Sequence, residues 1–451
     1  MPWSAAALKE MRRLHKISLA VLTLCCAACS AQSLEDWDLA SQKWLAGQVA
    51  PNSVVPAPDA TRRRLLVSYG AATSDKADPG ADHSYTYDDA LGAISFVISG
   101  DPDAAAYTLE ALARLIRADG SLWFNYSTKD NWPDESDHDS AMVRAGAIGW
   151  AGYAFAFYLA NAPPCAAENA GCLRQRALLQ AAAVRLATYL TSLEATEPEN
   201  PAHGLLRQGY GNIRLVYHPE KNDVLEDYED VPARGFSTEN NISSWFFLRA
   251  LGEVSGDTRW SAAADRIRAA LLRVAWDKDL GQFDQGFTPG GQRDSVRALD
   301  CASWGALFLL AIGETEKANQ ALGNVEQYYA SRDGEAVGYR PYFDDHIFPG
   351  FDAGRFYFPD NPRKQWRELP LVWSEGSLGV ALAYLRTGQP DRARRIIDGL
   401  RPMQVASNGL RYATRSVPHQ MTDAPSIAGS AWLVFLTEAL KGNPLAEKFW
   451  K

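Results

Sequence analysis

The segment AGAIGWAGYAFAFYLA (residues 145–160) contains no charged side chain and is apolar around its whole circumference when it is wound as a helix. A helix of this kind must be buried on all sides. The segment is too short to cross a bilayer, and it carries three glycines. We therefore expect it to lie in the interior of a large helical domain.

Segments of two kinds alternate along the chain on either side of this one. Nearly uncharged segments rich in Gly, Ala, Ser and Trp cover residues 90–99, 242–251, 302–312, 376–385 and 427–440. Amphipathic segments with Arg and Glu cover residues 104–117, 173–193, 259–274, 314–329 and 392–400. Six buried helices, each paired with a surface helix, describe an all-α (α/α)6 toroid of six inner and six outer helices. The sixth outer helix comes from residues 34–49 or from the chain end.

A glycine turn followed by an aromatic residue recurs after the amphipathic segments. It is found at Gly120 and Trp123, at Gly281 and Phe283, and at Gly409 and Tyr412. Glycine just past a helix end supplies a left-handed cap, and the residues after it are typical of a short return strand or loop. A repeat of roughly sixty residues indicates one closed domain. We assign this single catalytic domain to residues 61–451, after an N-terminal segment and linker at 29–60.

The first residues have the pattern of an export signal. Arg12, Arg13 and Lys16 precede an apolar stretch at 17–28, which has the length of a signal-peptide core. The sequence that follows resembles a bacterial lipobox, with small residues before Cys29, although Cys26 replaces the usual leucine. We therefore expect a lipoprotein-type signal peptide at 1–28, a lipid on Cys29 and a periplasmic or outer-membrane location. Cleavage after residue 31, which would release a soluble exported protein, is the alternative.

The cysteines outside the leader agree with export. Cys165 and Cys172 lie in one Pro- and Gly-flanked loop, where an oxidising compartment favours a local disulfide. No second pair or nearby histidine completes a tetrahedral zinc set. Cys301 lies in an apolar segment and is expected to be a buried thiol.

Composition excludes several classes of function. The net charge of the 451-residue chain is −9, and it has no basic run that would bind nucleic acid. Phosphate-binding loops, His-Glu-x-x-His and Gly-x-Ser-x-Gly motifs are absent from the sequence. The only dense cluster of His and acids is 137–139, which a surface loop explains equally well. We expect no metal, no cofactor and a monomer.

Acidic residues stand where the buried segments begin. In a toroid these starts converge on one face, so Asp88, Asp89, Glu239, Asp300 and Glu375 would surround a common cleft. Asp423 precedes the last buried segment in the same way. Each acid also suits a helix N-terminus as a cap. Several acids on one rim favour use in chemistry, because crowded like charges cost energy.

Cleavage of a glycoside needs one protonated and one ionised carboxyl group. Glu239, beside Asn240 and near Trp245, is the first choice for the acid. Asp300 and Glu375 are the two main candidates for the general base, and Asp88 is a further candidate.

The chain contains 14 Trp, 18 Tyr and 17 Phe residues, which serve either as core or as platforms for sugar rings. We interpret the aromatic residues near loops as ligand-binding residues. For those inside buried segments, such as Trp150 and Trp304, we favour a role in the hydrophobic core. The predicted substrate-binding residues are Asp89, Trp123, Tyr126, Trp132, Asn240, Tyr339 and Trp373, with Phe124, Tyr342 and Trp366 as further candidates. The acidic run at 226–230 is expected to be a solvated loop.

Four quoted stretches carry a family resemblance: Tyr87-Asp88-Asp89-Ala90, the run from Ser237 to Ile242, the run from Leu299 to Trp304, and Val372-Trp373-Ser374-Glu375-Gly376. Together with the helix alternation over residues 81–440, they resemble the inner-helix openings of the six-hairpin glycosidase superfamily. Bacterial secreted endoglucanases of glycoside hydrolase family eight are one comparison. The resemblance implies polysaccharide or oligosaccharide substrates and hydrolysis with inversion.

The leading hypothesis is an exported, endo-acting glycoside hydrolase linked to exopolysaccharide turnover. The second is a polysaccharide lyase, for which Tyr412, Arg415 and His419, or Tyr339 and Arg340, would supply the proton-transfer and charge-neutralising groups. The third is a glycan-binding lipoprotein without activity.

Overall fold

The structure is a computed structural model, which describes residues 33–49, 65–70, 82–133, 138–218, 220–221, 223–294, 296–343, 366–417 and 419–451. The predicted signal peptide, Cys29 and most of the linker lie outside these residues. None of the described helices combines the length and the hydropathy needed to span a bilayer.

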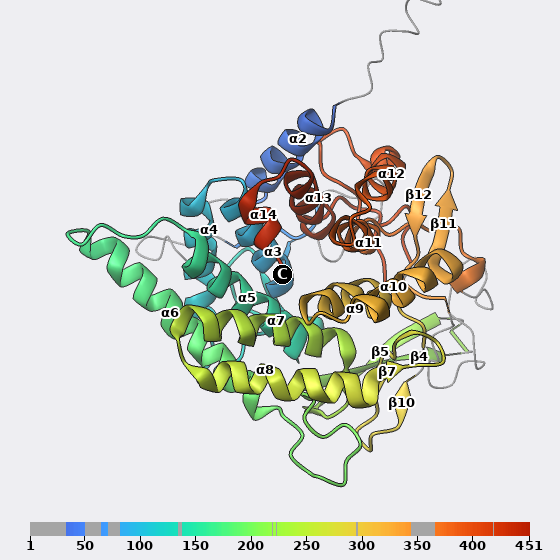
Figure 1. Ribbon diagram of the computed structural model, residues 1–451, viewed down its shortest axis with the longest axis horizontal. Helices are drawn as coiled ribbons and strands as arrows, with labels where there is room; N and C mark the ends of the chain where they lie inside the picture. Colours follow the sequence, from blue (N-terminus) through green and yellow to red (C-terminus); the bar gives the residue numbers. More distant parts are fainter. Residues whose placement is uncertain are drawn as a thin grey trace, which may run out of the picture.

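Inner helices form a closed ring within the described residues. They are α3 (Thr86–Ile98), α5 (Ala145–Asn161), α7 (Thr238–Ser255), α9 (Leu299–Ala311), α11 (Ser374–Arg386) and α13 (Ile427–Leu440). Each packs against the next, and α13 packs against α3 (Figure 1). Every residue of α5 from Ala145 to Leu159 is buried, as its apolar circumference requires.

Outer helices pack on the ring one by one. They are α4 (Pro102–Leu115), α6 (Ala170–Ser192), α8 (Thr258–Ala270), α10 (Thr315–Asn324), α12 (Pro390–Leu400) and α2 (Leu34–Gly47). The sixth outer helix is thus α2, which packs on α13, where the Thr437 hydroxyl donates to Asp38 Oδ1 at 2.6 Å. The barrel therefore includes residues from the segment that precedes position 61. The (α/α)6 toroid expected from the alternating segments is confirmed.

The chain end fills the middle of the ring instead of adding an outer helix. After the short helix α14 (Pro444–Lys448), Phe449 and Trp450 are buried on the ring axis, where Figure 1 shows the C-terminus. The Trp450 ring stacks on Phe246 and Trp150, with centroids 4.6 and 4.5 Å apart. It meets Trp304 edge-on at 5.1 Å. These rings plug the axis of the barrel.

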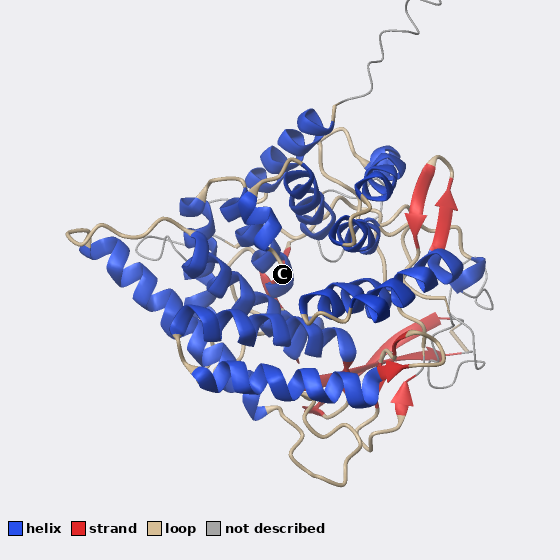
Figure 2. Ribbon diagram, viewed as in Figure 1, coloured by secondary structure: helices blue, strands red, loops and turns tan. Residues whose placement is uncertain are grey.

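Short antiparallel strands gather on one side of the helices (Figure 2). Three of them immediately precede inner helices: β1 before α3, β3 before α5 and β6 before α7. The strands pair as β1 (His83–Tyr85) with β2 (Asn125–Ser127); β3 (Val143–Arg144), β4 (Gly209–His218) and β5 (Asp223–Ala233); β6 (Phe236–Ser237), β9 (Gly286–Phe287) and β10 (Arg293–Asp294); β7 (Trp276–Asp277) with β8 (Gln282–Phe283); and β11 (Ala330–Asp333) with β12 (Ala336–Tyr339). The acidic run at 226–230 belongs to strand β5. The expectation of a loop there is therefore wrong, because cross-strand pairing with β4 holds the run extended.

Short helical turns complete the described secondary structure. They are η2 (His138–Ala141), the π-helical η3 (Leu271–Ala275) and η4 (Val325–Tyr329), η5 (Trp366–Glu368) and η6 (Arg401–Met403). The turns after outer helices show the predicted left-handed glycine in part. Gly120 and Gly281 have positive φ, and Gly281 lies between β7 and β8. In the third turn Asn408 takes the left-handed conformation, while Gly409 leaves room for the Trp44 ring.

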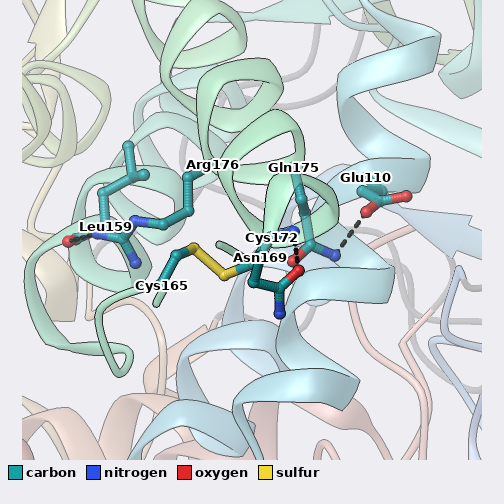
Figure 3. The surroundings of a disulfide bond; sticks show 7 residues. All are labelled: Glu110, Leu159, Cys165, Asn169, Cys172, Gln175 and Arg176. Carbon is teal, nitrogen blue, oxygen red and sulfur yellow. Dashed lines mark hydrogen bonds between the residues drawn. A yellow bond between two sulfur atoms is a disulfide. The ribbon is translucent and has the colours of Figure 1, made fainter. Parts of the chain in front are cut away.

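The predicted disulfide is confirmed. Cys165 and Cys172 are bonded, with Cα atoms 5.7 Å apart, in the loop that joins α5 to α6 (Figure 3). Asn169 inside this loop caps α6 by accepting from the Cys172 backbone N–H. Gln175 in the first turns of α6 then donates to Glu110 of α4 at 2.6 Å. Cys301 is a free, buried thiol, as predicted.

Candidate active site

A cleft of about 750 Å³ opens at the starts of the inner helices. Glu239, Asp300 and Glu375, which begin α7, α9 and α11, all line it. Three of the predicted catalytic carboxyl groups are therefore brought together. Trp150 and Trp304 also line the cleft, and the C-terminal plug supports both rings from within the barrel.

Helix capping does not account for these acids. The N-cap positions of α7, α9 and α11 are Ser237, Ala298 and Trp373. In α7 the Ser237 hydroxyl accepts from the Asn240 backbone N–H, so Glu239 is not the cap. Each of the three acids lies two residues past its N-cap and lines the cleft.

Glu375 is buried at the centre of a hydrogen-bond network. The Tyr87 hydroxyl donates to Glu375 Oε1, and the same hydroxyl accepts from Trp432 Nε1 at 3.1 Å. Tyr412 also forms a hydrogen bond to Glu375. Burial raises the pKa of Glu375 to about 8, while the two tyrosine hydroxyls act in the opposite direction by favouring the ionised form.

The other two carboxyl groups have fewer partners. Burial alone raises the pKa of Glu239 to about 7. Burial, followed by the charges of Glu239 and Glu375, raises the pKa of Asp300 well above its usual range. Asp300 Oδ1 is buried without a hydrogen-bond partner among the residues that the structure describes. Because burial raises the pKa of all three acids, and the charges of Glu239 and Glu375 raise that of Asp300 further, the three hold fewer than three charges near neutral pH.

Asp88 and Asp89 lie behind the cleft and do not line it. Ser68 and the Ala428 backbone hydrogen-bond to Asp88, whose burial raises its pKa to about 7. Asp89 accepts from Leu66 N and Ser84 Oγ, each at 2.8 Å, and so fixes the segment 65–70 to α3. The structure therefore places Asp88 as a neighbour of Glu375 and Asp89 in a structural network.

The predicted sugar-binding residues divide into two groups. Asn240 and Trp373 line the cleft. Trp123 lies under the Arg117 guanidinium at 3.9 Å, and Tyr126 is buried with its hydroxyl accepting from Trp123 N. Neither of them borders the cleft, nor do Trp132, which is 58% exposed, and Tyr339, whose hydroxyl donates to Glu326 in a separate outer groove. Phe124 and Tyr342 border the cleft, whereas Trp366 packs behind Tyr342.

Several residues that line the cleft were not among the site residues predicted from the sequence. Tyr87 precedes Asp88 in one of the four stretches that carry the family resemblance, so its position was a usable signal. Tyr412 was considered only for a lyase. Arg144, Arg293 and Gln208 come from strands and loops without a recurring pattern, and nothing in the sequence marked them. Trp150 and Trp304 pack in the core and also line the cleft. The C-terminal residues fill one end of the ring axis, and the cleft opens at the other end.

Neither proposed lyase set is assembled. Arg415 is held by Asp333 through hydrogen bonds of 2.7 and 3.0 Å, and His419 contacts Glu226, so only Tyr412 of that set lines the cleft. Arg340 donates to the backbone oxygens of Ala330 and Trp366, away from the cleft.

No metal centre is formed by the described residues. The groups that they bring together include no set of three or more His, Cys, Asp or Glu side chains placed to hold a metal ion. Of the cluster at 137–139, residue 137 lies outside the described residues, and the backbone of the other two belongs to η2.

No known protein family and no curated protein matches the sequence. Solved structures match over most of both chains. A glycosidase variant in complex with glucose is 13% identical, with a TM-score of 0.56 over 90% of this chain and 97% of that chain. A GH76 α-mannanase from Bacteroides thetaiotaomicron is 9% identical, with a TM-score of 0.56 over 91% and 97%. Cellobiose 2-epimerase from Bacillus thermoamylovorans is 10% identical, with a TM-score of 0.57 over 91% and 99%. The resemblance to the six-hairpin glycosidases is thereby confirmed for the fold.

Proposed function

We propose that the protein is a glycoside hydrolase acting on a polysaccharide or oligosaccharide. The observation that carries the proposal is the meeting of Glu239, Asp300 and Glu375 in one cleft that Trp rings also line. Hydrolysis of a glycoside requires two carboxyl groups in different protonation states, and crowded buried acids provide them. The glycosidase and the mannanase among the similar structures support the same reaction class.

In the proposed mechanism Glu239 is the general acid and Glu375 the general base. Glu239 gives its proton to the leaving glycosidic oxygen, while Glu375 takes a proton from the water that attacks the anomeric carbon. Attack from the face opposite the leaving group inverts the configuration. Asp300 lies near both groups, and its burial together with the charges of Glu239 and Glu375 raises its own pKa, which favours its protonated form.

The role of Glu375 follows from its donors. Two tyrosine hydroxyls direct hydrogen bonds to it, and such bonds stabilise a carboxylate more than a neutral acid. The order of the two pKa values, about 7 for Glu239 and about 8 for Glu375, points the other way. The two carboxyl groups therefore need to be distinguished by kinetics.

The test is the variant Glu239→Gln. Glutamine keeps the shape but cannot deliver a proton, so hydrolysis of the natural glycan should fall by about 10²–10⁴. A nitrophenyl glycoside should partly restore activity, since a good leaving group needs little protonation. Glu375→Gln should not be restored by that substrate. Glu253→Gln, an exposed site further along the same helix, is the matched control and should keep full activity.

A reducing-end assay across purified polysaccharides identifies the substrate. Binding of a glycan without new reducing ends would contradict the proposal and favour a binding protein. Isomerised or epimerised sugar without bond cleavage would place the chain with the epimerase-like relatives. Restoration of Glu375→Gln, but not of Glu239→Gln, by the nitrophenyl substrate would exchange the two roles.

We also propose that the protein is exported, carries a lipid on Cys29 and takes part in exopolysaccharide turnover. The support is the basic and apolar leader that ends at a lipobox-like sequence. Cys29→Ser should move the protein from the membrane fraction to the soluble fraction in a cell fractionation. An unchanged distribution would show that no lipid anchors it.

A further inference from the structure

Strands β4 and β5 form the longest hairpin among the described residues, and it ends in a contact with a distant part of the chain. Near its tip, Glu226 Oε1 lies 3.1 Å from His419 Nδ1. His419 belongs to the loop between α12 and α13, whereas the hairpin lies between α6 and α7. We call the Glu226–His419 contact the clasp.

The clasp joins two loops that the ring holds far apart. Along the ring, α7 is followed by α9, α11 and α13, so the loops before α7 and α13 stand at opposite positions. Figure 1 shows the hairpin extending past α9. The clasp therefore passes along the side of the ring that carries α9 and α11.

Both loops also border the cleft. Gln208, at the base of the hairpin, lines the cleft, as do Gln420 and Met421 immediately after His419. Glu226 and His419 do not themselves line the cleft, so the clasp stands beside it and ties together the two loops whose neighbouring residues border it.

The hairpin that carries Glu226 and the loop that carries His419 are each held in place by their own hydrogen bonds. The hairpin is anchored where the Tyr228 hydroxyl donates to the Ala141 backbone oxygen at 3.0 Å. In the opposite loop, Val417 pairs with Met421, and His419 takes a left-handed conformation with φ of 60°. Arg415 ties that loop to Asp333 of β11. The two loops are therefore held in place, and the clasp that joins them forms a fixed wall beside the cleft.

We propose that this wall restricts the enzyme to the ends of glycan chains. The proposal rests on the hydrolase function and replaces the endo action expected from the sequence. A polysaccharide cut internally must leave the cleft in two directions, and the clasp closes one of them. A chain end needs only one entrance. The clasp residues are thus specificity-determining, and they do not touch the reacting atoms.

The experiment compares viscosity loss with the formation of reducing ends on the polysaccharide that the wild-type enzyme cleaves. Wild type should release short products with little loss of viscosity. The double variant Glu226→Ala/His419→Ala should raise the viscosity loss per reducing end by about two- to five-fold, the range for a partly exposed ion pair. The matched control is Glu220→Ala, which removes a second His–Glu pair (His218 to Glu220, 2.9 Å) on the same hairpin, and it should change nothing.

A covalent lock tests whether the clasp stays closed during turnover. Glu226→Cys with His419→Cys, once oxidised together with a short dithiol that spans the gap between the two cysteines, should keep the wild-type kcat and KM on a short oligosaccharide. Activity that is lost on oxidation and regained on reduction would overturn the proposal, since the clasp would then have to open. So would rapid viscosity loss by wild type, or an unchanged ratio in the double alanine variant. If wild type releases no reducing ends from any glycan, the hydrolase function itself fails, which is a separate outcome.

Discussion

Replacing Tyr87 with phenylalanine removes one hydroxyl from the centre of the cleft network. That hydroxyl donates to Glu375 Oε1 and accepts from Trp432 Nε1. The ring, which packs edge-on against Trp150 at 5.2 Å, stays in place. The substitution therefore isolates the hydrogen bond from the packing.

The size of the effect follows from the lost hydrogen bond. A hydrogen bond to a charged group contributes about 1.5–3 kcal/mol, and 1.36 kcal/mol corresponds to one pKa unit. Loss of a donor to the ionised form raises the pKa of Glu375, so less base is ionised at neutral pH. The acidic limb of the kcat/KM profile should move up by about one to two pH units. At pH 7 the rate should fall about 10- to 100-fold, with recovery as the pH is raised.

The assay is the pH dependence of kcat/KM, which reports the groups of the free enzyme. Thermal unfolding serves as the companion measurement, because Trp432 Nε1 is left as a buried donor without its acceptor and should cost about 1–3 kcal/mol. A limb that does not move, together with a lower stability, would show that Tyr87 has a purely structural role. Movement of the alkaline limb instead would identify Glu375 as the acid.

Two further predictions concern parts of the fold away from the carboxyl groups. Cys165→Ser/Cys172→Ser should lower the free energy of unfolding by about 2–3 kcal/mol through the entropy of the released loop; urea unfolding measures it, and a reductant should lower wild type equally, so that an unequal loss would contradict this account. Trp450→Ala should cost about 3–5 kcal/mol and raise KM, because Trp150 and Trp304 lose their support, whereas Trp450→Phe should restore most of both. Trp37→Ala, which removes an equally buried ring on α2, should destabilise without raising KM; equal KM changes in both alanine variants would refute a role of the plug in the cleft.

Most of the barrel could be predicted from its inner helices, because a helix that is apolar all round can lie only in the interior of the domain. The segments 145–160 and 427–440 match α5 and α13 closely. The starts of α3, α7, α9 and α11 were placed two to four residues late. Their first turns carry polar residues such as Glu239 and Asp300, which face the cleft and interrupt the apolar pattern. The polar residues that displaced the predicted helix starts are therefore the same residues that form the candidate active site.

The carboxyl groups of the cleft were predictable because helix starts fix where they lie. The aromatic residues were not, because the direction of a ring depends on neighbours distant in sequence. Trp123 is held by Arg117, and Tyr339 turns to Glu326. Trp150 reaches the cleft only because Phe449 and Trp450 fill the axis beneath it. No local pattern records such contacts.

The closure of the ring by α2, α3 and α13 has a consequence for how the chain folds. Asp38 and Thr437 are separated by 399 residues, and their hydrogen bond forms only when both ends of the barrel meet. Contacts of such separation form slowly, since a long loop must be ordered before they can stabilise anything. Until then the apolar inner helices lie beside an open seam. We expect an open crescent to precede ring closure during folding, and its exposed edge to be prone to associate with other chains.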